Sequence, residues 1–364
     1  MMSSETNLNE NLSNDDKDEG FVNLFAKILI LGAGFYILMI VGLSCNGVVL
    51  YVVCRFRKTN TVTSLFIGNL AVSNIILLFC LVPDLISYTY TPWDLGWFSC
   101  KGVQYIKGVA TCASAYSVVA ISLKRWVTVC HPFMSTITKK QVTVILIVIW
   151  IISCFVSLPR LAYFITLKVD ANGETVICIE KWPESIQIWQ KYNYLAGSFV
   201  ISYLIPLTTI SVCNIGIWYQ LYVRGLDQSH SGERRMNMFY QKLKPAVTGM
   251  LLAIVLTFGL TWLPHQVSAL RWEFRMNTLF EFEAGRISFR SMFAEWLAWS
   301  NCITSPLLYT LFDKKFIKCL DTLSRCQEVY PSRVTRRHDT RRKRQPIVHK
   351  VPIQNPKLSK HKSS

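Results

Sequence analysis

The sequence predicts an all-α membrane protein, a seven-transmembrane helix bundle. Of its 364 residues, 51% are hydrophobic and only 17% are charged, whereas a soluble globular domain carries about 25% charged residues. Seven apolar runs recur along the chain, each long enough for the roughly 20 residues that a helix needs to cross a bilayer. Membrane β-strands would give runs of only about ten residues. Helices also satisfy their own backbone hydrogen bonds in lipid, so a helical bundle follows.

The first twenty residues are polar and acidic, without the apolar core of a cleaved signal peptide. The first membrane span must therefore act as the anchor, and we expect residues 1–26 to be extracellular. Asn11 opens the glycosylation sequon Asn11-Leu12-Ser13 in this tail.

The bundle is predicted to occupy residues 27–312. Its spans are Ile28–Cys54, Thr63–Tyr88, Lys101–Cys130, Val142–Phe164, Asn193–Tyr222, Pro245–Leu270 and Ser288–Phe312. With the N-terminus outside, the basic residues of the loops gather on the cytoplasmic side, for example Arg55, Arg57 and Lys58 after the first span. This asymmetry follows the positive-inside rule.

Residues 313–326 predict a short amphipathic eighth helix on the inner leaflet, with Phe316 and Ile317 towards lipid. Cys319 is the candidate palmitoylation site, and an unmodified buried thiol is the alternative. Residues 327–364 are basic and lack apolar periodicity, so a disordered cytoplasmic tail is predicted. The net charge of +17 lies in this tail and at span ends, which favours anionic lipid over nucleic acid as the partner.

The twelve cysteines include no Cys-x-x-Cys pair, so neither a metal site nor a cofactor is predicted. The loops are short, and they hold no nucleophile–base set or phosphate-binding loop. The sequence therefore argues against an enzyme.

Short motifs recur in order along the predicted spans. They are CNGVVL with Asn46, NLAVSN at 69–74, SLKRWVTVCHP with Arg125, Trp150, Pro206, FGLTWLP with Trp262, and SPLLY at 305–309. In this order they resemble the rhodopsin-like (class A) G-protein-coupled receptors, over nearly the whole chain. Trp93, Gly96 and the segment CIEKWP at 178–183 resemble the neuropeptide and galanin receptor branch.

The resemblance implies a plasma-membrane receptor that transmits binding of an extracellular ligand, by this branch a peptide, to a heterotrimeric G protein. Arrestin is a further candidate partner. The alternative is an atypical receptor that scavenges its ligand without signalling. A light-sensing retinal protein would need a lysine between Ser288 and Phe312, where none occurs. A transporter or channel would need charges on several spans, whereas the spans offer essentially Lys107 and Glu295.

The resemblance also implies a disulfide between Cys100, at the top of the third span, and Cys178, in the second outer loop. Both lie in an oxidising compartment on this topology. Asn172-Gly173, between two β-favouring segments, predicts a hairpin in that loop. Such a hairpin resembles the open lid of peptide receptors, and a purely structural loop is the alternative.

The third span carries one polar face, because its polar residues recur at steps of four and three. They are Cys100, Gln104, Lys107, Thr111 and Ser114. Lys107 lies about seven residues deep, where a charge costs about 2.5–3.5 kcal/mol, so it should face the bundle interior and find a partner. Glu295 is the only acid that we place at matching depth. We predict a Lys107–Glu295 ion pair on the cavity floor, which either engages a charged ligand group or is purely structural.

The resemblance places four more side chains around the same cavity, and they complete the candidate ligand-binding set with Gln104, Lys107, Thr111 and Glu295. The four are Trp262, His265, Gln266 and Trp299. A role in core packing is the alternative for these residues.

Relatives in this family usually end the second-span motif in Asp, which helps to hold a sodium ion. Here that residue is Asn74, and Ser305 replaces the usual Asn, while Ser114 and Asn301 remain. A neutral amide is a poor ligand for a dehydrated cation, so this degenerate site predicts little sodium sensitivity.

The family's inner switch is retained in Arg125, Pro306 and Tyr309. However, Lys124 stands where an acid normally precedes the arginine, and Asn214 stands where the fifth span usually carries Tyr. Loss of the acid should raise basal activity, because the resting state loses a restraint. Loss of the Tyr should weaken the active state instead. Both outcomes stay open, although the surviving residues favour a receptor that still couples.

Overall fold

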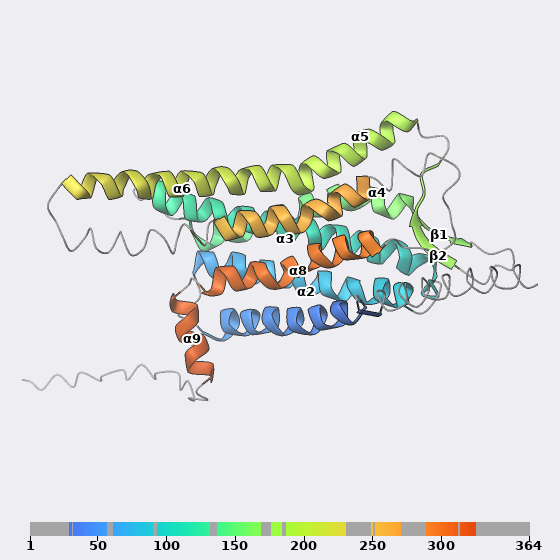
Figure 1. Cartoon of the computed structure of the whole chain (residues 1–364), viewed down its shortest axis with the longest axis horizontal. Coiled ribbons are helices and arrows are strands. Elements are labelled where there is room, and N and C mark those ends of the chain that lie inside the picture. The colour runs from blue at the N-terminus through green and yellow to red at the C-terminus, as the bar shows by residue number, and fades with distance from the viewer. Residues whose placement is uncertain are drawn as a thin grey trace, which may run out of the picture.

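The structure is a computed structural model in which helices lie side by side as a bundle (Figure 1). It describes residues 29–30, 32–56, 61–89, 93–131, 137–168, 176–183, 187–230, 249, 252–270, 289–311 and 314–324. The predictions for Asn11, for the tails at 1–26 and 327–364 and for the Asn172-Gly173 turn lie outside these residues.

Seven helical segments of the described residues correspond to the seven predicted spans. They are the helix Gly32–Arg55, α2 (Val62–Thr89), α3 (Gly96–Cys130), α4 (Lys139–Tyr163), α5 (Ile188–Phe199) continued through the π-helix η2 (Val200–Leu204) into α6 (Ile205–His230), the helix Leu252–Leu270, and α8 (Phe289–Leu311). Six are long and apolar enough to cross a membrane, and the 23-residue α8 takes the seventh place. The largest difference in bounds is at the fifth span, which begins before Asn193 and continues past Tyr222.

Asparagine side chains, buried at Asn46 and partly buried at Asn69, join neighbouring helices at the motif positions. Asn46 of the first helix donates its Nδ2 to the Cys302 carbonyl of α8 at 2.9 Å. Asn69 of α2 donates its Nδ2 to Ser117 Oγ of α3 at 2.7 Å and accepts at Oδ1 from Trp150 Nε1 of α4 at 2.9 Å. Because an unsatisfied amide is costly in an apolar interior, these bonds fix the register of the first helix against α8 and of α2 against α3 and α4.

The fifth span contains a π turn, Val200–Leu204, just before Pro206. Proline has no N–H to donate into the preceding turn, and a wider turn accommodates the missing hydrogen bond. Tyr203 on this turn is buried and donates its hydroxyl to the Gly259 carbonyl of the helix Leu252–Leu270 at 2.9 Å. The turn thereby joins the fifth and sixth spans.

The predicted hairpin is confirmed as β1 (Phe164–Lys168) paired antiparallel with β2 (Val176–Glu180). Cys178 of β2 is joined to Cys100 of α3 by a disulfide, with the two Cα atoms 5.7 Å apart. Trp93, just before α3, is buried and donates its backbone N–H to the Val176 carbonyl. The hairpin is thus attached to the start of α3 at two points.

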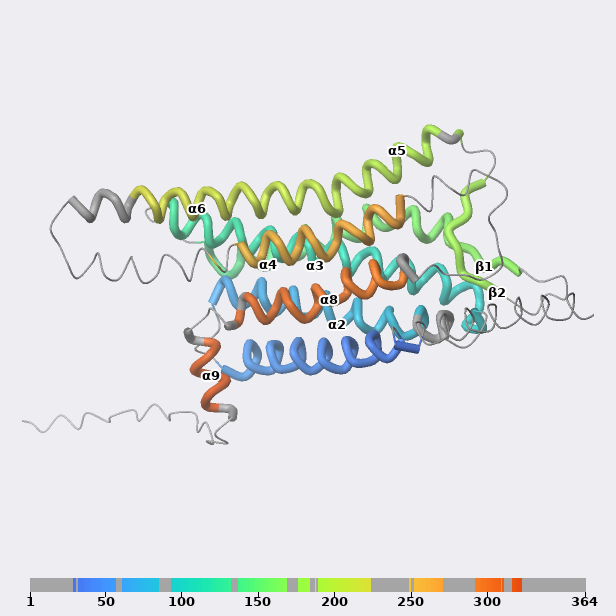
Figure 2. The backbone as a smooth tube through the Cα atoms, in the orientation of Figure 1, coloured from blue at the N-terminus to red at the C-terminus, as the bar shows by residue number. Residues whose placement is uncertain are grey.

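The predicted eighth helix is confirmed as α9 (Lys314–Ser324), which crosses the end of the bundle opposite the hairpin (Figures 1 and 2). Its orientation corrects the expectation for Phe316, which is 4% exposed and packs into the core with Cys319, whereas Ile317 is 43% exposed. Phe316 faces the bundle because α9 contacts α8 and uses its apolar stripe to cover the bundle end. Palmitoylation of Cys319 stays a prediction.

Candidate ligand site and inner switch

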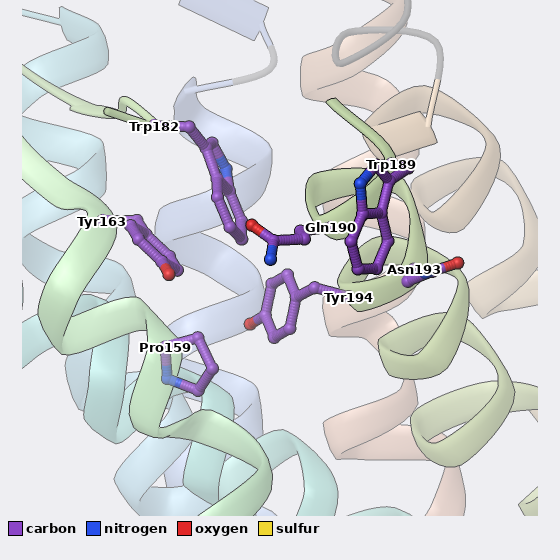
Figure 3. Close-up of a pocket in the computed structure, with 7 residues that line it drawn as sticks. All are labelled: Pro159, Tyr163, Trp182, Trp189, Gln190, Asn193 and Tyr194. Carbon is purple, nitrogen blue, oxygen red and sulfur yellow. The ribbon is translucent and has the colours of Figure 1, made fainter. Parts of the chain in front are cut away.

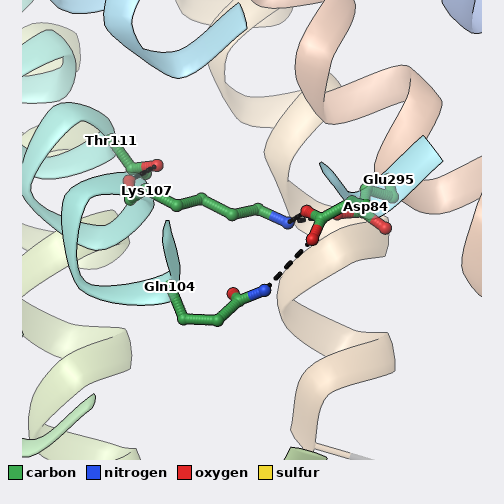
Figure 4. A network of polar contacts seen from close by, with 5 residues as sticks. All are labelled: Asp84, Gln104, Lys107, Thr111 and Glu295. Atoms are coloured by element: carbon green, nitrogen blue, oxygen red, sulfur yellow. Dashed lines mark hydrogen bonds and ion pairs between the residues drawn. The ribbon is translucent and has the colours of Figure 1, made fainter. Parts of the chain in front are cut away.

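A buried network of charges lies between α2, α3 and α8 (Figure 4). Lys107 Nζ of α3 is 2.6 Å from Asp84 Oδ2 of α2 and 2.6 Å from Glu295 Oε1 of α8. Gln104, one turn before Lys107, donates its Nε2 to Asp84 Oδ1 at 3.1 Å. Three helices therefore meet at one ammonium group.

The ion pair predicted between Lys107 and Glu295 is present, but the expectation that Glu295 is the only acid at this depth is wrong. Asp84 is a second acid at this depth, because α2 continues to Thr89 and leaves Asp84 inside the helix, 5% exposed. The sequence did contain the signal, since Asp84 falls within the apolar run Thr63–Tyr88. An acid inside a membrane span is a functional candidate by default.

The network is shielded from water and closed on one side by an aromatic ring. The side chains of Lys107, Asp84 and Glu295 are 14%, 6% and 11% exposed. Lys107 Nζ lies 5.1 Å from the ring centroid of Trp299 on α8, within cation–π range. Thr111 instead donates its hydroxyl to the Lys107 carbonyl on its own helix, at 2.8 Å. Five side chains thus form one connected group: Gln104, Lys107, Glu295 and Trp299 from the predicted ligand set, together with Asp84.

The helix Leu252–Leu270 carries the other three predicted ligand residues. Trp262 is 9% exposed and meets His265 edge to face, with ring centroids 6.0 Å apart. Gln266 is partly buried and forms no hydrogen bond within the part of the chain that the structure describes. Trp262 and His265 therefore contact each other, and Gln266 makes no polar contact with the charged set.

Comparison with known proteins identifies the family. Residues 45–309 match the family described as 7 transmembrane receptor (rhodopsin family). The chain belongs to this family.

Relatives within this rhodopsin family include receptors named for peptides. The chain is 30% identical over 290 residues to tachykinin-like peptides receptor 86C of Drosophila melanogaster, which covers 78% of this chain and 56% of that receptor. It is 29% identical over 311 residues to galanin receptor type 1 of Rattus norvegicus, covering 84% of each chain. Over 303 residues it is 26% identical to neuropeptide Y receptor type 2 of Cavia porcellus, covering 82% of this chain and 77% of that receptor.

In this rhodopsin-family chain, the residues of the degenerate sodium site bond to protein groups. Ser114 Oγ donates to Asn74 Oδ1 at 2.9 Å. The Ser305 hydroxyl donates to Asn301 Oδ1, and Asn301 Nδ2 donates to Thr261 Oγ1 at 3.1 Å. Both amide oxygens that a cation would need already accept a protein hydrogen bond. This geometry supports the sodium prediction, which stays a prediction.

The inner end of α3 packs tightly against α6. Lys124 donates its Nζ to Thr128 Oγ1 at 2.8 Å, one turn along the same helix. A Cβ added at Gly216 of α6 would lie only 2.7 Å from Trp126 Nε1, so glycine leaves the space that the indole occupies. Sequence analysis missed this contact, because the two residues lie far apart in the chain.

The remaining switch residues are placed only in part. Arg125 is partly buried near the inner end of α3, Asn214 is 5% exposed on α6, and Pro306 is buried within α8. The side chain of Tyr309 lies outside the described set. Their role in switching stays a prediction.

Proposed function

We propose that this receptor binds an extracellular peptide at the hairpin end of its helix bundle and couples to a heterotrimeric G protein at the other end. The family match over residues 45–309 carries the proposal. The names of the relatives, which refer to tachykinin-like peptides, galanin and neuropeptide Y, support a peptide as the ligand. The hairpin and α9 lie at opposite ends of the bundle (Figure 1), as an outer lid and an inner-leaflet helix require.

The charged network is the proposed floor of the peptide site. It offers an incoming ligand one ammonium group and two carboxylates, from Lys107, Asp84 and Glu295. A charged ligand group could replace one member of the network, so that the remaining buried charges keep an opposite charge as partner. Trp262 and His265 on the neighbouring helix would contact the same ligand.

The proposed cellular location is the plasma membrane, with the hairpin outside. Excess Lys and Arg in the loops at the α9 end supports this orientation. Arrestin, which binds the same cytoplasmic face, is a further proposed partner.

A peptide screen on cells that express the full chain tests the proposal. The library should contain tachykinin, galanin and neuropeptide Y type peptides, and both G-protein dissociation and arrestin recruitment should be read. We expect at least one peptide class to activate the wild-type chain. An Arg125→Ala variant is the matched control, because it should bind the same peptide without G-protein dissociation. Silence in both readouts, with uptake of bound peptide, would favour the scavenging alternative.

A further inference from the structure

A pocket separate from the charged network lies where α4 ends and α5 begins, beside the hairpin (Figure 3). Its volume is about 440 Å³, within the range of small-ligand sites. It is lined by Pro159, Tyr163, Trp182, Trp189, Gln190, Asn193 and Tyr194. None of these residues belongs to the charged network, which is built on α2, α3 and α8.

Three of the lining rings already contact one another, and together they are called the stack below, although only Tyr163 and Trp182 are stacked face to face and Tyr194 is tilted by 50° against Trp182. The centroids of Tyr163 and Trp182 are 3.7 Å apart, and those of Trp182 and Tyr194 are 5.4 Å apart. Trp182 Nε1 donates to Glu180 Oε1 at 3.1 Å. The indole N–H of the stack is therefore held by the protein.

Trp189 stands apart from this stack, on the other side of the pocket in Figure 3. It is 54% exposed and contacts no other aromatic ring among the described residues. Its Nε1 donates to Gln187 Oε1, just before α5 begins, and this bond orients the indole. The large, exposed ring of Trp189 is thus held in place, and the pocket lies between this ring and the stack.

We propose that this pocket is a binding site for an aromatic side chain, Trp or Tyr, of the extracellular peptide ligand. The proposal rests on the peptide-receptor function proposed above. A ring inserted between Trp189 and Tyr194 extends the stack through offset or edge-to-face contacts. The amides of Gln190 and Asn193 line the same pocket, and they can accept a hydrogen bond from a phenol or indole.

A choline-type cation is the competing occupant, because aromatic faces also attract cations. Tyr194 lies in the fields of both Arg160 and Glu180, and these opposite charges leave no net attraction for a cation at this place. An aromatic group without charge therefore fits the pocket better.

Fragment binding tests the pocket without knowledge of the natural peptide. The probe is N-acetyl-L-tryptophanamide, titrated against the full chain in phosphatidylglycerol nanodiscs, which bring no choline head groups. Saturation-transfer NMR reports binding, and N-acetyl-L-leucinamide is the control without a ring. We expect saturable binding of the tryptophan probe only. Trp189→Ala should weaken it about tenfold, whereas Trp189→Phe should retain it.

Trp218→Ala is the matched control, because Trp218 is an exposed ring on α6 outside the pocket. It should leave probe binding unchanged. Equal binding of the leucine probe, full binding by Trp189→Ala, or displacement of the probe by choline chloride would each overturn the proposal. Peptide activation without probe binding would overturn the pocket and leave the receptor function standing. Probe binding in a chain that no peptide activates would retain the aromatic pocket and overturn the proposed function.

Discussion

Replacing Lys107 with methionine removes the ammonium that two buried carboxylates share. Each carboxylate lies 2.6 Å from Nζ, and Coulomb's law at an effective dielectric constant of 20 gives about 6 kcal/mol for each contact. Much of this Coulomb energy offsets the desolvation of the three charges. Breaking a buried ion pair typically lowers the free energy of unfolding by about 3–5 kcal/mol. Since Lys107→Met leaves two like charges close together, we expect the loss of stability to lie near the upper end of that range.

Removal of one carboxylate should cost less. Asp84→Asn or Glu295→Gln leaves one ammonium facing one carboxylate, a balanced pair, and we expect a loss of about 1–3 kcal/mol. A simple pair of Lys107 and Glu295 would instead predict that Asp84→Asn has no effect. The ranking of the three variants therefore separates a three-charge network from a pair.

The assay is the thermal unfolding midpoint of the full chain in nanodiscs, together with surface expression in cells. Lys101→Met is the matched control, because Lys101 lies on the same helix and forms no ion pair among the described residues. The triple variant Lys107→Met, Asp84→Asn, Glu295→Gln should recover most of the lost stability, since no charge is left buried. Equal midpoints for Lys107→Met and Lys101→Met would refute the reasoning, as would a silent Asp84→Asn.

Three other outcomes are expected. Exchange of potassium chloride for sodium chloride at constant ionic strength should leave agonist binding unchanged, because Asn74 offers no carboxylate and its Oδ1 already accepts from Ser114; a sodium-specific loss of affinity contradicts this. Lys124→Asp should lower ligand-free G-protein dissociation by restoring an acid beside Arg125, and an equal or higher basal signal would refute the restraint hypothesis. Gly216→Ala should lower the free energy of unfolding by about 1–3 kcal/mol, seen as a lower unfolding midpoint, because the added Cβ would lie 2.7 Å from Trp126 Nε1. An unchanged midpoint would show that the indole moves at little cost.

The spans and the hairpin were predictable because their signals are local. A membrane helix is a long apolar run, and Asn172-Gly173 between β-favouring segments predicts a hairpin without knowledge of distant contacts. The disulfide between Cys100 and Cys178 came from the family resemblance, since twelve cysteines allow many pairings by sequence alone.

The features that sequence analysis missed depend on where helices end and which faces meet. Asp84 was missed as a partner of Lys107 because the outer end of a span is not marked by hydropathy when the helix continues past the apolar core. Phe316 was assigned to lipid because an amphipathic stripe does not say whether protein or bilayer covers it. The contact of Trp126 with Gly216 and the pocket around Trp189 join segments that only the tertiary fold brings together.

The orientation of the bundle in the plasma membrane underlies the entire proposed function, and epitope tags at the two ends of the chain measure it most directly. On intact cells an antibody should detect the N-terminal tag at the surface, and it should reach the C-terminal tag only after permeabilisation. This result would place the hairpin, the charged network and the aromatic pocket towards the extracellular space. Detection of the C-terminal tag on intact cells would contradict it.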